Sequence, residues 1–308
     1  MAKINKEDSA LGATIEEIDL REPLDEDLTA FISHALAENE VIFFRDQEIS
    51  PQQHKDFALR FGKLQSHPVY PTVEDFPEIT ILENDEKNPS KIEKWHTDMT
   101  FKQIPPLGSI LLGKVIPKKG GDTLFSSLSA AFNDLSKEMK ESLMPMTAIH
   151  SFEHGFKESL AEPYGREKLS QALIDNPPIE HPVIRTHPIT GKKLIFVNSL
   201  FTLKIKSMSD SESKELLEFL CEHIKQEKYQ CRFTDMSCGL FFTQYYVNNI
   251  SSIPITSFSQ NSFGIIIKSI LIYIHGKRIV DMIESSSGKG SACFLYILES
   301  KMSCTECI

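Results

Sequence analysis

Between about residues 79 and 200 the sequence is a succession of short apolar stretches separated by turn-forming residues. Ile79 to Leu82 and Gly108 to Ile116 favour strands, and His181 to Val197 favours a hairpin with its turn at Pro188 to Gly191. Many short strands with turns between them are typical of a barrel or jelly roll. Because helical segments lie between the strands, we expect a mainly β fold with flanking helices, of the α+β class.

Four segments predict helices around this β region. Asp25 to Glu38, Ser50 to Gly62, Ser129 to Leu143 and Ser209 to Ile224 place apolar residues at helical spacing. The second and fourth begin with a serine followed three residues later by Gln or Glu, which is a capping box. Residues 151–180 lack a clear period and predict a loop that could cover a site.

The composition excludes several classes of function. The chain has 308 residues, 41% hydrophobic and 25% charged, which is typical of a globular protein of one large or two ordinary domains. A net charge of −10 argues against nucleic acid or an anionic membrane as the main partner. No apolar run is long enough to cross a bilayer, and the N-terminus has no apolar signal region. We therefore expect a cytoplasmic protein.

All cysteines lie in the last third of the chain, which does not fit a disulfide framework across the whole fold. We expect them to be reduced, and we interpret the C-terminal C-x-x-C pair as part of a frayed tail. The cysteines are Cys221, Cys231, Cys238, Cys293, Cys304 and Cys307.

The segment Trp95 to Phe101 contains the pattern that carries chemistry. Its His96 and Asp98 are two residues apart, so in an extended strand both side chains point the same way. An imidazole and a carboxylate that converge are two of the three ligands in the set of two histidines and one carboxylate that holds non-haem Fe(II). A His-x-Asp triplet also occurs by chance in surface strands, so its surroundings decide its meaning.

Those surroundings resemble the TauD/TfdA family of Fe(II)- and 2-oxoglutarate-dependent dioxygenases over roughly residues 10–234. The motifs that carry the resemblance occur in the family's order. They are Leu11-Gly12-Ala13, Asp19-Leu20-Arg21, Phe43-Phe44-Arg45-Asp46-Gln47, His54 to Gly62, Trp95 to Phe101, Gly120-Gly121-Asp122-Thr123, His187-Pro188-x-Thr190-Gly191, Phe196-Val197-Asn198 and Tyr229 to Phe233.

The resemblance implies a double-stranded β-helix, a cupin-like jelly roll, with iron at one mouth. His96 and Asp98 would be two of the iron ligands, and Thr123 matches a position that binds a co-substrate carboxylate. His67 matches a residue that binds the anionic group of the substrate. The implied cofactors are Fe(II) and 2-oxoglutarate. The implied partners are O2 and a small organic acid, a sulfonate such as taurine, and a homo-oligomer is left open.

Each assignment has a plainer alternative. Thr123 could be an ordinary strand threonine, and His67 an ordinary loop histidine beside a proline turn. Trp95 is expected to be part of the wall of the site. The remaining histidines of this region match no ligand position, and we expect them to be structural; they are His150, His154, His181 and His187.

The resemblance stops after Phe233. The family continues with its third iron ligand, in a Gln-His-Tyr segment, and then with an arginine that binds the distal carboxylate of 2-oxoglutarate. Here Tyr245 stands at the ligand place, and His275 is a candidate surrogate whose spacing to Arg278 differs from the family's. We therefore expect the β-helix to lack its usual closing strands. The run Ile265 to Ile274 has high β-propensity and could fill such an edge or aggregate.

Composition changes at the same point. Residues 1–234 carry 28 lysines and arginines and 38 acidic residues, whereas residues 235–308 carry five of each. We divide the chain into a dioxygenase domain, 1–234, and a divergent tail, 235–308. We hypothesise that the tail translates unspliced or frame-shifted message, because one codon choice for Ser262 to Ile266 encodes Phe-Trp-Asp-Asn when read two bases on.

Three functions remain open at this stage. The first is a dioxygenase of the resembled family. The second is a catalytically impaired isoform or a non-catalytic binding domain that lacks the third iron ligand and the arginine. The third keeps the fold and uses His96 and Asp98 for another metal, such as a hydrolytic zinc.

Overall fold

The computed structural model describes residues 2–84, 94–115, 122–233, 240–244, 248–250 and 267–275. Outside this part lie Gly120 and Gly121 of the family motif, Tyr245, the segment Ser262 to Ile266 and the four cysteines from Cys238 onward. Cys221 and Cys231, which lie within it, are free thiols. Within the described residues, no helix combines the length and apolar character needed to cross a membrane.

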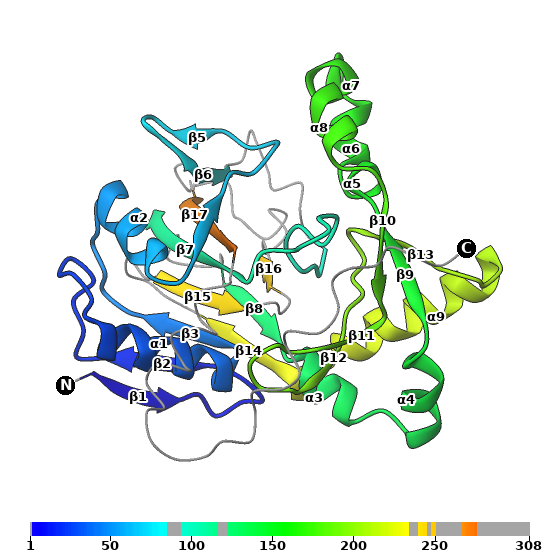
Figure 1. Cartoon of the computed structure of the whole chain (residues 1–308), viewed down its shortest axis with the longest axis horizontal. Coiled ribbons are helices and arrows are strands. Elements are labelled where there is room, and N and C mark those ends of the chain that lie inside the picture. Colours follow the sequence, from blue (N-terminus) through cyan, green and yellow to red (C-terminus); the bar gives the residue numbers. More distant parts are fainter. Residues whose placement is uncertain are drawn as a thin grey trace, which may run out of the picture.

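The helices and strands are short and alternate along the chain (Figure 1). The helices are α1 (Glu26–Asn39), α2 (Pro51–Leu59), α3 (Leu128–Asn133), α4 (Lys137–Leu143), α5 (Phe152–Gly155), α6 (Lys157–Ala161), α7 (Gly165–Lys168), α8 (Ser170–Asp175), α9 (Asp210–Ile224) and the 3-10 turn η1 (Glu227–Tyr229). The strands are β1 (Lys3–Lys6), β2 (Ala13–Glu16), β3 (Val41–Phe44), β4 (Lys63–Gln65), β5 (Thr72–Val73), β6 (Phe76–Asn84), β7 (Gly108–Val115), β8 (Thr123–Ser126), β9 (Thr147–His150), β10 (Ile179–Pro182), β11 (Ile184–Thr186), β12 (Lys193–Ile195), β13 (Thr202–Ile205), β14 (Gln230–Phe233), β15 (Leu240–Gln244), β16 (Asn248–Ile250) and β17 (Ile267–His275).

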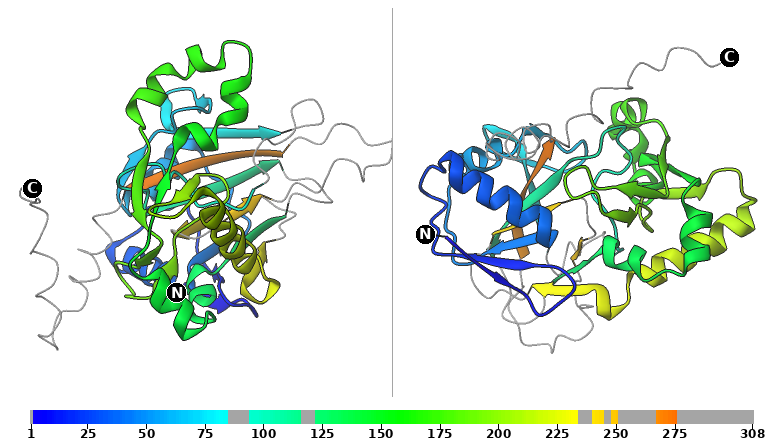
Figure 2. Two further views of the ribbon diagram at one scale, coloured as in Figure 1. Left: turned by 90° about the vertical axis from the view of Figure 1, so that its right-hand side faces the viewer. Right: turned by 60° about the horizontal axis from the view of Figure 1, so that its bottom comes forward.

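A nine-stranded sheet forms the base of the fold, in the order β1-β2-β3-β15-β7-β17-β6-β5, with β4 paired to β17. The strands from the C-terminal part of the chain are inserted between N-terminal ones. β15 pairs with both β3 and β7, and β17 pairs with both β7 and β6, all antiparallel. The left view of Figure 2 shows β17 lying between β6 and β7.

A second sheet, β14-β8-β16, faces the inner surface of the large one. Phe43 of β3 joins them, because its ring stacks on Phe233 of β14 at a centroid distance of 4.5 Å and lies 5.7 Å from Phe125 of β8. All three rings are nearly or fully buried, and they share one apolar cluster with Met99 and Phe101 of the His-x-Asp segment. The chemistry-bearing segment therefore lies against the space between two sheets.

Helices α1 and α2 cover the outer surface of the large sheet. Because side chains alternate along a strand, Phe44 points away from Phe43 and meets Phe57 of α2 at 5.7 Å. Ile32 and Leu36 of α1 belong to the same outer cluster and are fully buried. Both predicted helices are confirmed, and Ser50 caps α2 through a complete capping box with Gln53.

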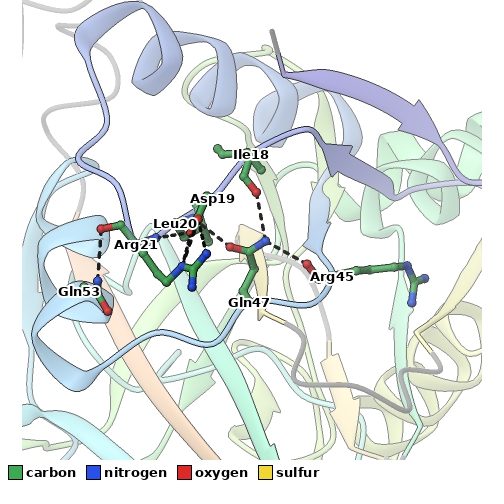
Figure 3. A network of polar contacts seen from close by, with 7 residues as sticks. All are labelled: Ile18, Asp19, Leu20, Arg21, Arg45, Gln47 and Gln53. Carbon is green, nitrogen blue, oxygen red and sulfur yellow. Dashed lines mark hydrogen bonds and ion pairs between the residues drawn. The ribbon is translucent and has the colours of Figure 1, made fainter.

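The amide of Gln47 ties the first turns of the chain to the end of β3 (Figure 3). Its Oε1 accepts a hydrogen bond from Leu20 N at 2.9 Å, and its Nε2 donates to Ile18 O and Arg45 O. Asp19 and Arg21 pair beside it, at 2.6 Å. The Asp-Leu-Arg and Arg-Asp-Gln motifs singled out in the sequence are thus one structural unit.

A smaller lobe carries β9 to β13, α3, α4 and α9 around a separate apolar core. The predicted hairpin is confirmed as β11 and β12, and the capping box of Ser209 begins α9 as predicted. The prediction of one helix over 129–143 is wrong, because α3 ends at Asn133 and Ser136 caps a second helix, α4.

The prediction of a loop over 151–180 is also wrong, since this segment forms the short helices α5 to α8 (Figure 1). Its Phe152, Phe156 and Leu160 join the inner cluster that contains Phe101. These residues stabilise through tertiary packing a helical segment that has little periodicity of its own.

The sequence leaves two possibilities for the run Ile265 to Ile274, which are to fill an open sheet edge or to aggregate. The described part of this run takes a place in a sheet. Residues 267–275 form β17, within the large sheet. Three strands of the tail, β15, β16 and β17, thus fill places in the two facing sheets.

Candidate functional site

The segment from Trp95 to Phe101 is extended at His96 and then turns. His96 makes an isolated bridge, whereas residues 98–101 form a turn in which Met99 has a φ of 50°. The amide of Lys102 closes this turn by donating to Met99 O at 2.9 Å. The segment is therefore extended only as far as residue 97, although the side chains of His96 and Asp98, which we call the dyad, still converge.

The predicted pair is close: His96 Nε2 lies 3.3 Å from Asp98 Oδ1. His96 Nδ1 donates to Lys94 O at 2.7 Å, so a neutral ring presents the lone pair of Nε2 to the carboxylate. Burial alone would lower the pKa of His96, but the hydrogen bond and the charge of Asp98 outweigh it and raise that pKa. Two electron-rich atoms at 3.3 Å require a cation between them, either a proton or a metal ion.

A serine from the large sheet orients the carboxylate. Ser109 of β7 is 2% exposed, and its hydroxyl donates to Asp98 Oδ2 at 3.2 Å. The other carboxylate oxygen of Asp98, Oδ1, faces His96. Sequence reasoning did not find Ser109, although its place one residue into a predicted strand beside the motif could have suggested it.

A buried polar network holds the turn from behind. Thr100 Oγ1 lies 3.0 Å from His150 Nδ1 and accepts from Asn198 Nδ2 at 3.2 Å. His181 Nε2 donates to the carbonyls of Thr100 and Lys102 at 3.0 and 3.1 Å. His150 and His181 are thus placed as structural residues, as predicted, and they fix the loop that carries the dyad.

His67 lies near enough to Asp98 to be affected by its charge, and its ring contacts aromatic residues. Its ring is 4.6 Å from that of Tyr70 and 5.9 Å from that of Phe156. Its Nδ1 accepts from Val69 N at 3.2 Å, which leaves the proton of a neutral ring on Nε2. Burial lowers the pKa of His67 to about 4, even though the nearby Asp98 charge favours protonation. At neutral pH His67 is therefore a hydrogen-bonding group without charge.

Thr123 begins β8, on the second sheet. It is 7% exposed and is paired with Phe233 on one side and Ile250 on the other. Alternation along β8 puts Thr123 on the same face as Phe125, which packs between the sheets. An ion pair between Arg232 and Asp122, at 2.7 Å, fixes the start of the strand.

Within the described residues, no third His, Cys, Asp or Glu joins His96 and Asp98 in a metal-binding group. The backbone of the candidate surrogate, His275, pairs with Lys63 at the end of β17, and its neighbour Ile274 pairs with Gly108 beside Ser109. The donor types, their convergence and the fixed Nδ1 of His96 fit a divalent cation. Within the described residues, two such donors, His96 and Asp98, meet at this point.

Comparisons with known proteins place the chain in a family. The sequence model of the family described as "Taurine catabolism dioxygenase TauD, TfdA family" matches residues 4–234. The chain is 32% identical to an alkylsulfatase of Acinetobacter baylyi, over 75% of this chain and 73% of that protein. It is 31% identical to an alpha-ketoglutarate-dependent sulfate ester dioxygenase of Pseudomonas putida, over 70% and 71%. Its structure resembles a taurine dioxygenase from Burkholderia xenovorans with a TM-score of 0.74 and 27% identity, over 89% of each chain.

In sequence and in fold the chain thus matches dioxygenases that use alpha-ketoglutarate, which is 2-oxoglutarate. The chain belongs to the TauD/TfdA family, a family of oxidoreductases. The expected family is confirmed.

Proposed function

We propose that this chain is an Fe(II)- and 2-oxoglutarate-dependent dioxygenase that oxidises a small organic acid bearing a sulfonate or sulfate ester group. Taurine is the sulfonate expected from the sequence, and relatives named for sulfate esters add the second class. The observation that carries the proposal is the convergence of His96 Nε2 and Asp98 Oδ1 at 3.3 Å in a buried site.

His96 and Asp98 would hold the iron, which supplies the activation of O2 needed to oxidise an unreactive carbon. The bond from His96 Nδ1 to Lys94 O keeps Nε2 as the metal-facing atom. Ser109 keeps one carboxylate oxygen of Asp98 toward the same point. Thr123 would donate its hydroxyl to a carboxylate of 2-oxoglutarate.

His67 would donate its Nε2 proton to the anionic group of the substrate. Its aromatic surroundings, Tyr70 and Phe156, exclude water and so strengthen that hydrogen bond. Helices α5 to α8 would act as a lid, because Phe152 and Phe156 already pack on Phe101 of the dyad segment. We further propose that the two facing sheets are the family's jelly roll.

One observation favours a second candidate, a non-catalytic relative. The described residues supply two protein ligands, and the arginine expected to bind 2-oxoglutarate has no counterpart in the family's order. A domain of this kind would bind the organic anion without oxidising it. We carry the division at residue 234 as part of the same proposal, with the tail contributing strands and no family motif.

One assay separates the two. The full chain is purified without oxygen, supplied with Fe(II) and 2-oxoglutarate, and assayed for succinate with taurine or an alkyl sulfate. Sulfite would report oxidation beside a sulfonate, and sulfate would report oxidation beside a sulfate ester. We expect His96→Ala to abolish the product and His34→Ala, at an exposed histidine of α1, to leave it unchanged. If the unaltered chain forms no succinate under any condition, the enzyme proposal fails.

A further inference from the structure

Lys102 is a half-buried lysine next to the dyad segment, and its ammonium has no hydrogen-bonded or ion-paired acceptor among the described residues. Its Nζ lies 5.9 Å from the centroid of Phe101. The backbone of Lys102 is fixed at both ends, since its N–H donates to Met99 and its carbonyl accepts from His181. The side chain therefore starts from a rigid point.

A lysine in this position is unfavourable unless something binds it. Partial burial lowers the pKa of Lys102, and Asp175 of α8 acts in the opposite direction. Asp175 itself already accepts a hydrogen bond from Gln171, at 2.8 Å. Burying a cation without an acceptor costs free energy, so such a group is commonly kept for a ligand that supplies the acceptor.

Lys102 lies in the same aromatic environment as His67. The ring of Phe101 is 6.2 Å from that of Phe156, which is 5.9 Å from that of His67. The charge of Lys102 also contributes to the low pKa of His67. His67 offers a proton without charge, whereas Lys102 offers charge. An anionic group placed between them would meet both.

We propose that Lys102 is a specificity-determining residue that binds the sulfate or sulfonate group of the substrate opposite His67. This inference rests on the proposed function, because it names how this chain holds the anionic end of the same substrate. Asp175 of α8 attracts the same ammonium without pairing with it, and so weakens the attraction between Lys102 and an incoming anion.

Binding can be measured without turnover. Isothermal titration calorimetry measures it directly and needs no reporter group near the site. The full chain, loaded with Mn(II) and kept without oxygen, is titrated with hexyl sulfate, hexanesulfonate, hexanol and 2-oxoglutarate. The variants are Lys102→Met, Lys102→Arg and Asp175→Asn, with Lys168→Met at an exposed lysine of α7 as the matched control.

We expect Lys102→Met to weaken binding of the preferred anion by about tenfold or more and to leave hexanol binding unchanged, because a charge-assisted hydrogen bond is lost. Lys102→Arg should restore most of the affinity. Asp175→Asn should tighten anion binding by roughly two- to fivefold, the range of an exposed ion pair. The anion whose binding is weakened by Lys102→Met identifies the substrate class, either a sulfate ester or a sulfonate.

Three results would overturn the inference. Equal anion binding by Lys102→Met and the unaltered chain would remove Lys102 from the site and leave the proposed function standing. Weaker binding of 2-oxoglutarate alone would make Lys102 a co-substrate anchor instead. If the unaltered chain binds neither anion, both the inference and the proposed substrate class fail. Should Lys102→Met not fold, Asp175→Asn still decides the matter, because anion binding no tighter than that of the unaltered chain would contradict the inference.

Discussion

The hydroxyl of Ser109 donates a hydrogen bond of 3.2 Å to Oδ2 of Asp98, which links the large sheet to the carboxylate that faces His96. We predict that Ser109→Ala weakens Mn(II) or Co(II) binding by about 10–100-fold, the usual effect of losing such a supporting bond. Anaerobic metal titration measures it. Ser142→Ala, on the exposed face of α4, is the control, and equal affinity of the two variants would contradict the role given to Ser109.

Gln47 stabilises the fold away from the site. We predict that Gln47→Ala lowers the free energy of unfolding by about 1–3 kcal/mol, because it leaves the Leu20 amide and the Arg45 carbonyl without their buried partner. Urea denaturation checks this, with Gln52→Ala on the exposed side of α2 as the control. Metal affinity should not change in either variant.

We predict that the buried carboxyl group of Glu40 lowers the free energy of unfolding as the pH rises. It is 4% exposed, and burial raises its pKa above 4.5, although hydrogen bonds from Ser129 and Ser127 oppose this. The folded state therefore keeps this proton to a higher pH than the unfolded chain does. Its contribution is fully present below pH 4.5 and is lost as the pH rises through the folded-state pKa.

We expect Glu40→Gln to remove this dependence. At about pH 8 the variant should be more stable than the unaltered chain, by about 1.4 kcal/mol for each pH unit between the two pKa values. At pH near 4.5 the two should be alike. Urea denaturation of both proteins at the two pH values tests this, and Glu158→Gln, at an exposed glutamate of α6, controls for the loss of a charge. A variant that is less stable than the unaltered chain at the higher pH would contradict the reasoning.

We predict that the buried imidazole of His54 lowers the free energy of unfolding as the pH falls. It is fully buried in α2, and burial lowers its pKa from 6.5 to about 3. The unfolded chain therefore takes up a proton first, so the free energy of unfolding falls as the pH falls from 6.5 toward 3.

His54→Leu keeps the apolar bulk and cannot titrate, so it should flatten that slope by about 1.4 kcal/mol per pH unit. Thermal or urea unfolding between about pH 6.5 and 5 measures the slope, and His34→Leu, at the exposed histidine of α1, should leave it unchanged. An unchanged slope in His54→Leu would show that another group is responsible.

Features set by local sequence were predictable. Ser50 and Ser209 each accept from the amide three residues on, an interaction decided within one turn of chain, and both helices begin where predicted. The short helices α6 to α8 lack such signals, since none has a side-chain cap, and their stability depends on distant partners such as Phe101. The sequence therefore predicts a loop over residues 151–180.

The candidate site also has a part that local sequence predicts and a part that it does not. His96 and Asp98 are two residues apart, and their convergence could be predicted from the motif, although a turn at Met99 rather than a strand produces it. Ser109 and Asn198 reach the segment from 11 and 98 residues away. Their contribution depends on how the sheets and lobes pack, which local patterns do not contain.

The place of β17 has a consequence for how the chain is made. β6 and β7 are synthesised early, yet the strand that joins them is residues 267–275. During synthesis both edges therefore stay unpaired until that strand leaves the ribosome, and unpaired edges are where strands from other chains attach. Ser109 lies at the start of β7, so the sheet that orients the carboxylate of Asp98 is completed only after residues 267–275 have been synthesised.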